Sequence, residues 1–173
     1  RLLAEIAKLA LVDQLTGLPN RRLWDDRLPA ALADASRSGR PLAVAIIDLD
    51  HFKRYNDHHG HQAGDRLLHE AAAAWTDQLR AADLLARWGG EEFALLLPGA
   101  DRDDASEVLQ RLLEATPDGQ TFSAGVALIQ GRGTDSVGRV MAAADAALYD
   151  AKDAGRACIR TSSVPAIAEA RSA

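Results

Sequence analysis

Four carboxylates, in two pairs, are the side chains of this sequence that are best suited to chemistry. Asp48 and Asp50 end an apolar run, and two acids at period two fall on one face of a strand end. Glu91 and Glu92 follow a Gly-Gly pair that separates two other apolar runs. If these segments pair side by side, hard oxygen ligands converge, as Mg²⁺ requires. Taken alone, each pair is more typical of a solvated turn or strand end.

Basic side chains supply the opposite charge. Lys152 and Arg156 are four residues apart near the end of an expected helix, and Lys53 follows the first acidic pair. Together they are suited to a polyphosphate, because arginine offers a planar fork of donors and lysine offers a point charge. Taken alone, Lys152 and Arg156 are also typical of a helix C-terminus, where cations interact favourably with the helix dipole.

Two further polar side chains are of the kind that reads the edge of a guanine base. Asn56 offers an amide, and Asp65 offers a carboxylate that accepts hydrogen bonds from ring N–H and amino groups. An asparagine in a turn and an aspartate at a helix N-cap are the simpler interpretations of these two residues.

Two other patterns carry weaker signals. The five histidines all lie between His51 and His69. No cysteine is near them and their spacing matches no pair of ligands on one helix face, so zinc is not expected. The glycine-rich stretch at residues 131–135 lacks the lysine and the helix spacing of a phosphate-binding loop.

Helical and strand patterns alternate along the chain and position these groups. Apolar spacing predicts helices that begin near residues 21, 65, 101 and 137, with a loop at residues 60–64. Apolar runs predict strands at residues 42–47, 84–88, 92–97 and 121–129, and an edge strand at residues 157–160. Gly89 and Gly90 predict a tight hairpin, since glycine adopts positive φ freely. We therefore expect an α+β sandwich with helices on both faces of one sheet.

Composition restricts the class of protein. The 173 residues, 47% of them hydrophobic, suffice for one well-buried domain. The net charge of −5 argues against a nucleic acid or an anionic membrane surface as the main partner. A single cysteine, Cys158, suits a reducing compartment, and no apolar run reaches the length of about 18 residues that a membrane span requires. We expect a cytoplasmic domain at residues 11–160, a connector helix from an upstream domain at 1–10, and a flexible tail at 161–173.

Seven motifs in order resemble those of GGDEF-domain diguanylate cyclases. They are DQLTGLPNR at residues 13–21, DLDHFK at 48–53, ND, GH and GD at 56–57, 60–61 and 64–65, GGEEF at 89–93, SAGV at 123–126, AD with ALY and AK at 144–152, and GR at 155–156. The resemblance implies a fold similar to the palm of nucleotide cyclases and polymerases, a ferredoxin-like sandwich. It has a central five-stranded, mostly antiparallel sheet flanked by helices, plus a β-hairpin that carries the signature. One departure is Ala157, where the family usually has asparagine.

The resemblance also implies a reaction. Two GTP molecules, one in each subunit of a homodimer, condense to cyclic di-GMP and release two pyrophosphates. Asp48, the carbonyl of Leu49 and Glu91 would hold Mg²⁺ or Mn²⁺, and Asp48, Glu91 and Glu92 would be the catalytic residues. The group that accepts the proton of the attacking 3′-hydroxyl is left open between Glu91, Glu92 and a metal-bound water.

The substrate and product sites follow from the same resemblance. The implied GTP-binding residues are Leu15 and Leu68 against the base, Asn56 and Asp65 on its edge, Gly89 and Gly90 beneath the substrate, and Phe52, Lys53, Lys152 and Arg156 around the phosphates. Arg80 and Asp83 match the family's inhibitory product site, and Arg111 falls where a partner arginine often sits. A helix-end charge pair and a surface arginine are the simpler interpretations of these three residues.

Two alternatives differ in class from an active cyclase. A degenerate domain that binds GTP or cyclic di-GMP as a sensor would lack the signature acids, which are present here. A palm-fold enzyme acting on nucleic acid is disfavoured by the acidic net charge. The expected partners are therefore GTP, cyclic di-GMP, a second copy of the chain, and an upstream sensory or receiver domain, with neither nucleic acid nor direct membrane insertion.

Overall fold

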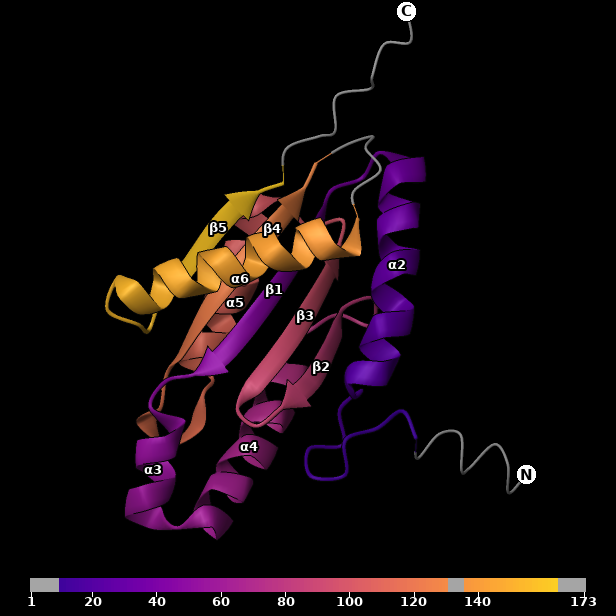
Figure 1. Ribbon diagram of the computed structural model, residues 1–173. Coiled ribbons are helices and arrows are strands. Elements are labelled where there is room, and N and C mark those ends of the chain that lie inside the picture. Colours follow the sequence, from indigo (N-terminus) through magenta and orange to yellow (C-terminus); the bar gives the residue numbers. More distant parts are fainter. Residues whose placement is uncertain (1–9, 131–135, 165–173) are drawn as a thin grey trace, which may run out of the picture.

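The computed structural model describes residues 10–130 and 136–164 and is built around one five-stranded sheet (Figure 1). Its strands run in the order β2-β3-β1-β4-β5. They are β1 (Leu42–Leu49), β2 (Leu84–Gly89), β3 (Glu92–Pro98), β4 (Phe122–Ile129) and β5 (Ile159–Ser163). All pairings are antiparallel except that between β4 and β5. The predicted α+β class and the mostly antiparallel five-stranded sheet are confirmed. The hairpin is not an addition to these strands, because β2 and β3 are members of the sheet.

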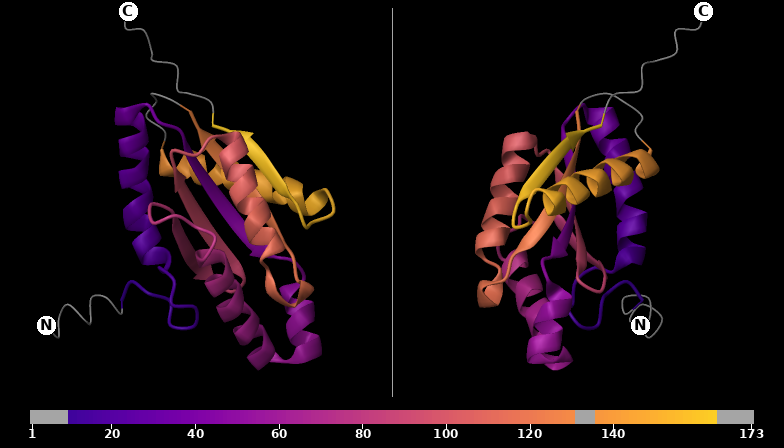
Figure 2. Two further views of the ribbon diagram at one scale, coloured as in Figure 1. Left: turned by 180° about the vertical axis from the view of Figure 1, so that it is seen from behind. Right: turned by 60° about the vertical axis from the view of Figure 1, so that its left-hand side comes forward.

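Helices cover both faces of the sheet. They are α2 (Arg21–Ser38), α3 (Phe52–His59), α4 (His61–Thr76), α5 (Arg102–Glu114) and α6 (Val137–Asp153), with a short 3₁₀ helix η1 (Pro117–Gly119). Helices α2 and α6 lie on one face, and α4 and α5 lie on the other (Figures 1 and 2). No helix in the described part of the chain is both long and apolar enough to cross a bilayer.

Strand β1 is the centre of the fold, and its side chains serve both hydrophobic cores. Ala45 and Ile47 pack into the core under α4 and α5, whereas Val44 and Ile46 pack into the core under α2 and α6. All eight residues of β1 are buried, as expected for a continuous apolar run between two helical layers. The strand therefore delivers Asp48 to its carboxyl end in one defined orientation.

The segment after β1 differs from the prediction. The predicted loop at residues 60–64 and the helix start at Asp65 are wrong, because α3 ends at His59 and α4 already begins at His61. Only Gly60, with φ of 87°, separates the two helices. Gly64 is the last residue of that predicted loop. It lies inside α4, where a Cβ atom would come within 1.8 Å of the side-chain oxygen of Asn56, so a close helix contact requires its small size.

The C-terminal boundary also differs. Strand β5 extends to Ser163, so residues 161–163, which were assigned to a flexible tail, belong to the sheet. Val164 is buried, and its backbone N–H donates to the carbonyl of Leu128 at 3.0 Å. The backbone hydrogen-bond partners of residues 161–163 come from parallel pairing with β4. The sequence of β5 is polar, so no apolar run indicated that these residues form a strand. Residues 1–9 of the connector predicted at 1–10, the glycine-rich stretch at 131–135 and residues 165–173 lie outside the described residues.

Candidate active site

The pairing of β1 with β3 brings the two acidic segments together. Asp48 lies opposite Glu92 in the antiparallel register. Beside them, the backbone N–H of Leu49 donates to the carbonyl of Glu91 at 3.2 Å. The predicted side-by-side arrangement of these segments is therefore confirmed. Asp48 is 9% exposed, Glu91 is half-buried and Glu92 is exposed, so one desolvated acid lies beside two that reach solvent.

Asp48 occupies an electrostatically unfavourable position for an anion. Burial raises its pKa, and the nearby negative charges of Glu91 and Glu92 raise it further. The ammonium group of Lys152, whose Nζ lies 3.1 Å from Oδ2 of Asp48, opposes this shift but does not cancel it. A divalent cation at this point would relieve the same excess of negative charge.

The donor set fits Mg²⁺ or Mn²⁺ in part. Carboxylate and carbonyl oxygens are the ligands that these hard cations prefer, and Asp48, Leu49 and Glu91, which carry such oxygens, lie on adjacent segments at the end of β1 and in the hairpin turn. No group of three histidine, cysteine or acidic side chains in the described part of the chain could hold a metal by itself. A cation here would therefore take its remaining ligands from substrate phosphates and water, as Mg²⁺ usually does.

Asp50 does not join this group, although the spacing predicted it on the same face. Its carboxylate accepts hydrogen bonds from the hydroxyls of Thr121 and Ser123, both at 2.7 Å, and from the backbone N–H of Ala157 at 3.0 Å. It is 4% exposed. The buried carboxylate of Asp50 thus links the end of β1 to β4 and to the segment after α6 through hydrogen bonds.

Arg87 supports the hairpin tip, a role that the sequence reasoning missed. Its Nε and Nη2 donate to the carbonyl of Gly90 at 3.2 and 2.9 Å. Its Nη1 lies 3.1 Å from both carboxylate oxygens of Asp13. Asp13 also accepts from the backbone and hydroxyl of Thr16, at 2.9 and 2.7 Å. The sequence signal for this contact was an aspartate and a threonine in the N-terminal motif and an arginine just before the signature.

The carboxylate of Asp13 is stabilised in its charged form. Burial tends to raise its pKa, but the hydrogen bonds from Thr16 and the guanidinium of Arg87 outweigh that effect and hold the pKa below its ordinary value. The backbone N–H of Arg87 also donates to the carbonyl of Pro19 at 2.9 Å. The N-terminal loop (residues 10–20) is therefore fastened to the base of the hairpin.

The tip itself is made by the two glycines. Gly89 and Gly90 have φ angles of 143° and 53°. Gly89 pairs with Glu92, so the turn lies one residue later than predicted, and Gly90 and Glu91 occupy its centre. Positive φ at Gly90 explains why glycine is needed at the first central position. Both glycines are exposed and leave the tip open to a bound molecule.

The residues expected to bind the base lie at the junction of α3 and α4. The side-chain oxygen of Asn56 is buried and has no hydrogen-bond partner among the described residues, a costly state unless a bound molecule donates to it. Asp65 is exposed on α4, and Leu68 is buried. Leu15 is half-buried, and its carbonyl lies 3.0 Å from a ring nitrogen of His69 on α4.

The expected phosphate-binding cations are separated along the chain. Lys53 is exposed in the first turn of α3, directly after the buried Phe52. Lys152 is in the last turn of α6 and reaches Asp48. Arg156 is exposed just beyond α6 and has a left-handed backbone with φ of 68°. Of these three cations, Lys152 is the one with a direct contact to the acidic group.

The residues of the expected product site directly precede β2, the first strand of the signature hairpin. Arg80 and Asp83 line a hollow of about 320 Å³, with Leu18, Pro19 and residues of β2. The carboxylate of Asp83 accepts a hydrogen bond from the backbone N–H of Arg80 at 2.8 Å. Arg111, on α5, instead contacts Glu107 and the carbonyl of Gln78, so its guanidinium already has partners.

The fold and the acidic group at the strand ends define an α+β domain of the nucleotide-cyclase type. The chain belongs to the GGDEF-domain family, because the family model described as "Diguanylate cyclase, GGDEF domain" matches residues 10–158. It is 43% identical over 157 residues to Diguanylate cyclase DgcP of Pseudomonas aeruginosa, covering 85% of this chain and 23% of that protein. It is 37% identical over 161 residues to Response regulator PleD of Caulobacter vibrioides, covering 86% and 35% of the two chains.

Solved structures are similar over nearly the whole chain. The coiled coil and GGDEF domain of DgcB from Caulobacter crescentus, in complex with c-di-GMP, has a TM-score of 0.86 at 31% identity, covering 92% of this chain and 90% of that one. Diguanylate cyclase SiaD of Pseudomonas aeruginosa, in complex with its activator SiaC, has a TM-score of 0.84 at 37% identity, covering 93% and 65%. The chain spans between 20% and 35% of the length of the first curated relatives.

Proposed function

We propose that this domain is a diguanylate cyclase that condenses two GTP molecules into cyclic di-GMP and two pyrophosphates. The observation that carries the proposal is the position of Glu91. Its backbone carbonyl accepts a hydrogen bond from the N–H of Leu49, and it lies beside the buried Asp48. The family membership of the chain supports the same reaction. Both the acids and the cations that the chemistry needs are present in this chain.

Asp48, the carbonyl of Leu49 and Glu91 are the residues proposed to hold Mg²⁺ or Mn²⁺. When bound, such a cation supplies Lewis-acid charge for the triphosphate. Lys53, Lys152 and Arg156 would bind the phosphates, with the backbone N–H groups near Phe52. Because Lys152 lies beside Asp48, it is placed to neutralise charge on the departing pyrophosphate.

The reaction breaks one bond for each bond that it forms. The 3′-oxygen of one GTP attacks the α-phosphorus of the other, and the bond to the pyrophosphate oxygen breaks. Glu91, Glu92 or a water molecule would accept the proton of the 3′-hydroxyl. Glu92 is exposed beside the tip and Glu91 is half-buried, and we propose that the substrate lies over Gly90, next to both acids.

Guanine selection is assigned to Asn56 and Asp65, with Leu15 and Leu68 beside the base. The unpartnered buried oxygen of Asn56 supports this assignment, because an N–H of the base would satisfy it. Asp65 would accept from the ring N–H and the amino group of guanine. A site built on hydrogen bonds rejects bases that leave its polar groups unpaired.

Each domain supplies half of the groups that the condensation needs, so we propose that it acts as a homodimer. The complex of DgcB with c-di-GMP supports product binding in this family, and Arg80 and Asp83, with Arg111 as a third contact, are proposed as a feedback-inhibition site. We also propose an upstream sensory or receiver domain, a connector at residues 1–10, and a cytoplasmic location, where GTP is available. The response regulator PleD, which is much longer than this chain, supports the upstream domain.

Incubation of the protein with GTP and Mg²⁺, with chromatographic resolution of the products, tests the activity. Asp48→Asn and Glu91→Gln should each abolish turnover while thermal melting shows a folded domain, because one negative ligand fewer weakens a hard-cation site. Asp26→Asn, at an exposed position on α2, is the matched control and should retain turnover. Near-normal turnover in either site variant would refute the metal assignment. Binding of GTP by the wild-type protein without turnover would favour a sensor domain instead.

A further inference from the structure

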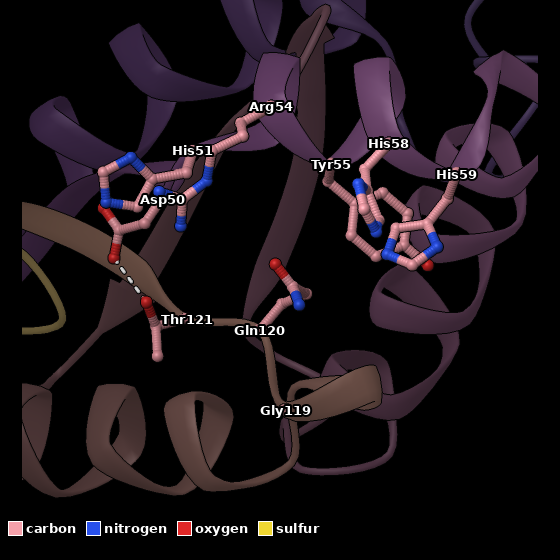
Figure 3. Close-up of a pocket in the computed structure, with 9 residues that line it drawn as sticks. All are labelled: Asp50, His51, Arg54, Tyr55, His58, His59, Gly119, Gln120 and Thr121. Atoms are coloured by element: carbon pink, nitrogen blue, oxygen red, sulfur yellow. Dashed lines mark hydrogen bonds between the residues drawn. The ribbon is translucent and has the colours of Figure 1, made fainter.

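A hollow of about 390 Å³ lies between α3 and the segment that joins η1 to β4 (Figure 3). Its walls are formed by Asp50, His51, Arg54, Tyr55, His58, His59, Gly119, Gln120 and Thr121. None of these side chains belongs to the proposed GTP site, although His51 directly precedes Phe52, near which backbone N–H groups are assigned to the phosphates. Figure 3 shows Arg54 directed toward the side of Asp50 and His51, with Tyr55, His58 and His59 grouped at the other side and Gln120 between them.

The hollow and the proposed guanine site lie on different faces of α3. Phe52 and Asn56, four residues apart, face α4, where Asn56 contacts Gly64. His51, Tyr55 and His58 recur at spacings of four and three residues, which places them together on another face. A molecule in the hollow would therefore not compete for the groups that are assigned to the base.

Two carboxylates at or beside the hollow already accept hydrogen bonds from the protein. Asp50 holds the three hydrogen bonds described above and is buried. The carboxylate of Asp118 accepts from the hydroxyl of Tyr55 at 2.8 Å, and the carbonyl of Asp118 accepts from the side-chain amide of Gln120 at 3.2 Å.

The donors, in contrast, are available. Within the described ranges, Arg54 forms no hydrogen bond or ion pair, and its positive charge lines the hollow together with the buried carboxylate of Asp50. The ring nitrogens of His51 and His58 also have no hydrogen-bond partner in those ranges. The positive charge of Arg66 and the negative charge of Glu70 lie on the α4 side of Tyr55, and their electrostatic effects on Tyr55 oppose each other. The free polar groups of the walls thus include the guanidinium of Arg54 and the N–H donor that each imidazole ring carries.

Aromatic rings line the other end. The ring centroids of Tyr55 and His59 are 4.6 Å apart, and those of His58 and His59 are 4.8 Å apart. Figure 3 places this aromatic group across the hollow from His51 and Arg54. The described residues include no set of three metal-ligating side chains close enough to hold a cation, so the histidines do not explain the hollow as a metal site.

We propose that this hollow is a second ligand site, separate from the GTP site, for a small phosphate-bearing anion. The guanidinium of Arg54 presents a planar fork that matches two phosphate oxygens, and the imidazoles add further donors. The volume is within the range of about 300–1,000 Å³ that is usual for small-molecule sites. Inorganic pyrophosphate and a nucleoside monophosphate share this phosphate chemistry, and the second would also use the aromatic rings.

Nuclear magnetic resonance of the histidine rings tests the proposal, with magnesium-free pyrophosphate and AMP as separate probes at neutral pH. The His58 and His59 signals should shift on titration of the wild-type protein. Arg54→Gln should weaken this response at least about tenfold, since it removes a charged bidentate contact. Arg54→Lys, which keeps the charge but loses the fork, should fall between them. Arg27→Gln, at an exposed position on α2, is the matched control and should bind as the wild type does.

A second variant separates this site from the proposed GTP site. Lys152→Gln should weaken pyrophosphate binding near Asp48 and leave the histidine response intact, while Arg54→Gln should retain cyclase turnover. A response to AMP alone identifies a nucleotide site, and a response to both probes identifies phosphate as sufficient. Histidine signals that shift with neither probe, or that shift undiminished in Arg54→Gln, would overturn the proposal. Absence of turnover in the wild type would refute the cyclase and leave this test unaffected.

Discussion

Replacement of Arg87 by glutamine tests whether the N-terminal loop holds the catalytic hairpin in place. The change removes the charged donors that hold the carbonyl of Gly90 at 3.2 and 2.9 Å. It also removes the ion pair with Asp13. Because Gly90 precedes Glu91 directly, loss of this support displaces a proposed metal ligand rather than a distant part of the fold.

The size of the effect follows from the burial of these groups. The two donors share one acceptor and count as about one charge-assisted hydrogen bond, worth about 1.5–3 kcal/mol. The side chains of Arg87 and Asp13 are 13% and 23% exposed, so their pair is worth more than a surface ion pair. Glutamine can restore one weaker hydrogen bond, which brings the expected loss to about 2–4 kcal/mol. Only part of this free energy affects the alignment of Glu91, because the tip keeps its other contacts. We therefore expect turnover to fall about 10- to 100-fold.

The assay is the rate of cyclic di-GMP formation at saturating GTP and Mg²⁺, with thermal melting of the same samples. Asp13→Asn and the double variant complete a cycle, and coupling of at least about 1 kcal/mol is expected for residues in direct contact. Arg22→Gln, exposed on α2, is the control for loss of an arginine. Turnover of Arg87→Gln within about twofold of the wild type would refute the positioning role.

Four further predictions address other parts of the domain. The pKa of Asp13 is lowered in the fold, so its stabilising contribution is present above the unfolded pKa of about 3.9 and is lost as the pH falls through the lowered value; the stability difference between wild type and Asp13→Asn should therefore vanish on acidification in denaturant titrations. Gly64→Ala would place a methyl group 1.8 Å from the present position of the Asn56 oxygen; it should raise the KM for GTP about tenfold, and an unchanged KM would contradict the role of Asn56. Arg80→Ala should abolish inhibition by added cyclic di-GMP with little change in the initial rate, as inhibition curves would show. Specific activity should rise with protein concentration over about a hundredfold dilution series; constant activity in samples that scatter light as monomers would exclude a two-subunit mechanism.

Local patterns were sufficient for much of the fold. The apolar run of β1 indicated a strand buried on both faces, and the Gly-Gly pair between apolar runs indicated a hairpin. These signals are short-range, because side-chain period and glycine conformation act within a few residues. The same logic failed at Gly64, where a glycine inside a helix has a packing reason that no local rule contains. It also failed at residues 161–163, because the pairing of β5 with β4 depends on a distant strand.

For the site, the sequence by itself determined which chemical groups are available: the acids of two segments, the cations and the amide of Asn56. Their family pattern identified the domain before any coordinates. Only the tertiary structure decided how these groups are used. Asp48 and Asp50 are both aspartates that the strand period predicts on one face. Asp48 lies beside Glu91 and Lys152, whereas the carboxylate of Asp50 accepts hydrogen bonds from Thr121, Ser123 and the segment after α6. The contact between Arg87 and Asp13 joins residues 74 positions apart. Such differences arise from desolvation and from hydrogen bonds between remote segments, which exist only once the sheet has brought those segments together.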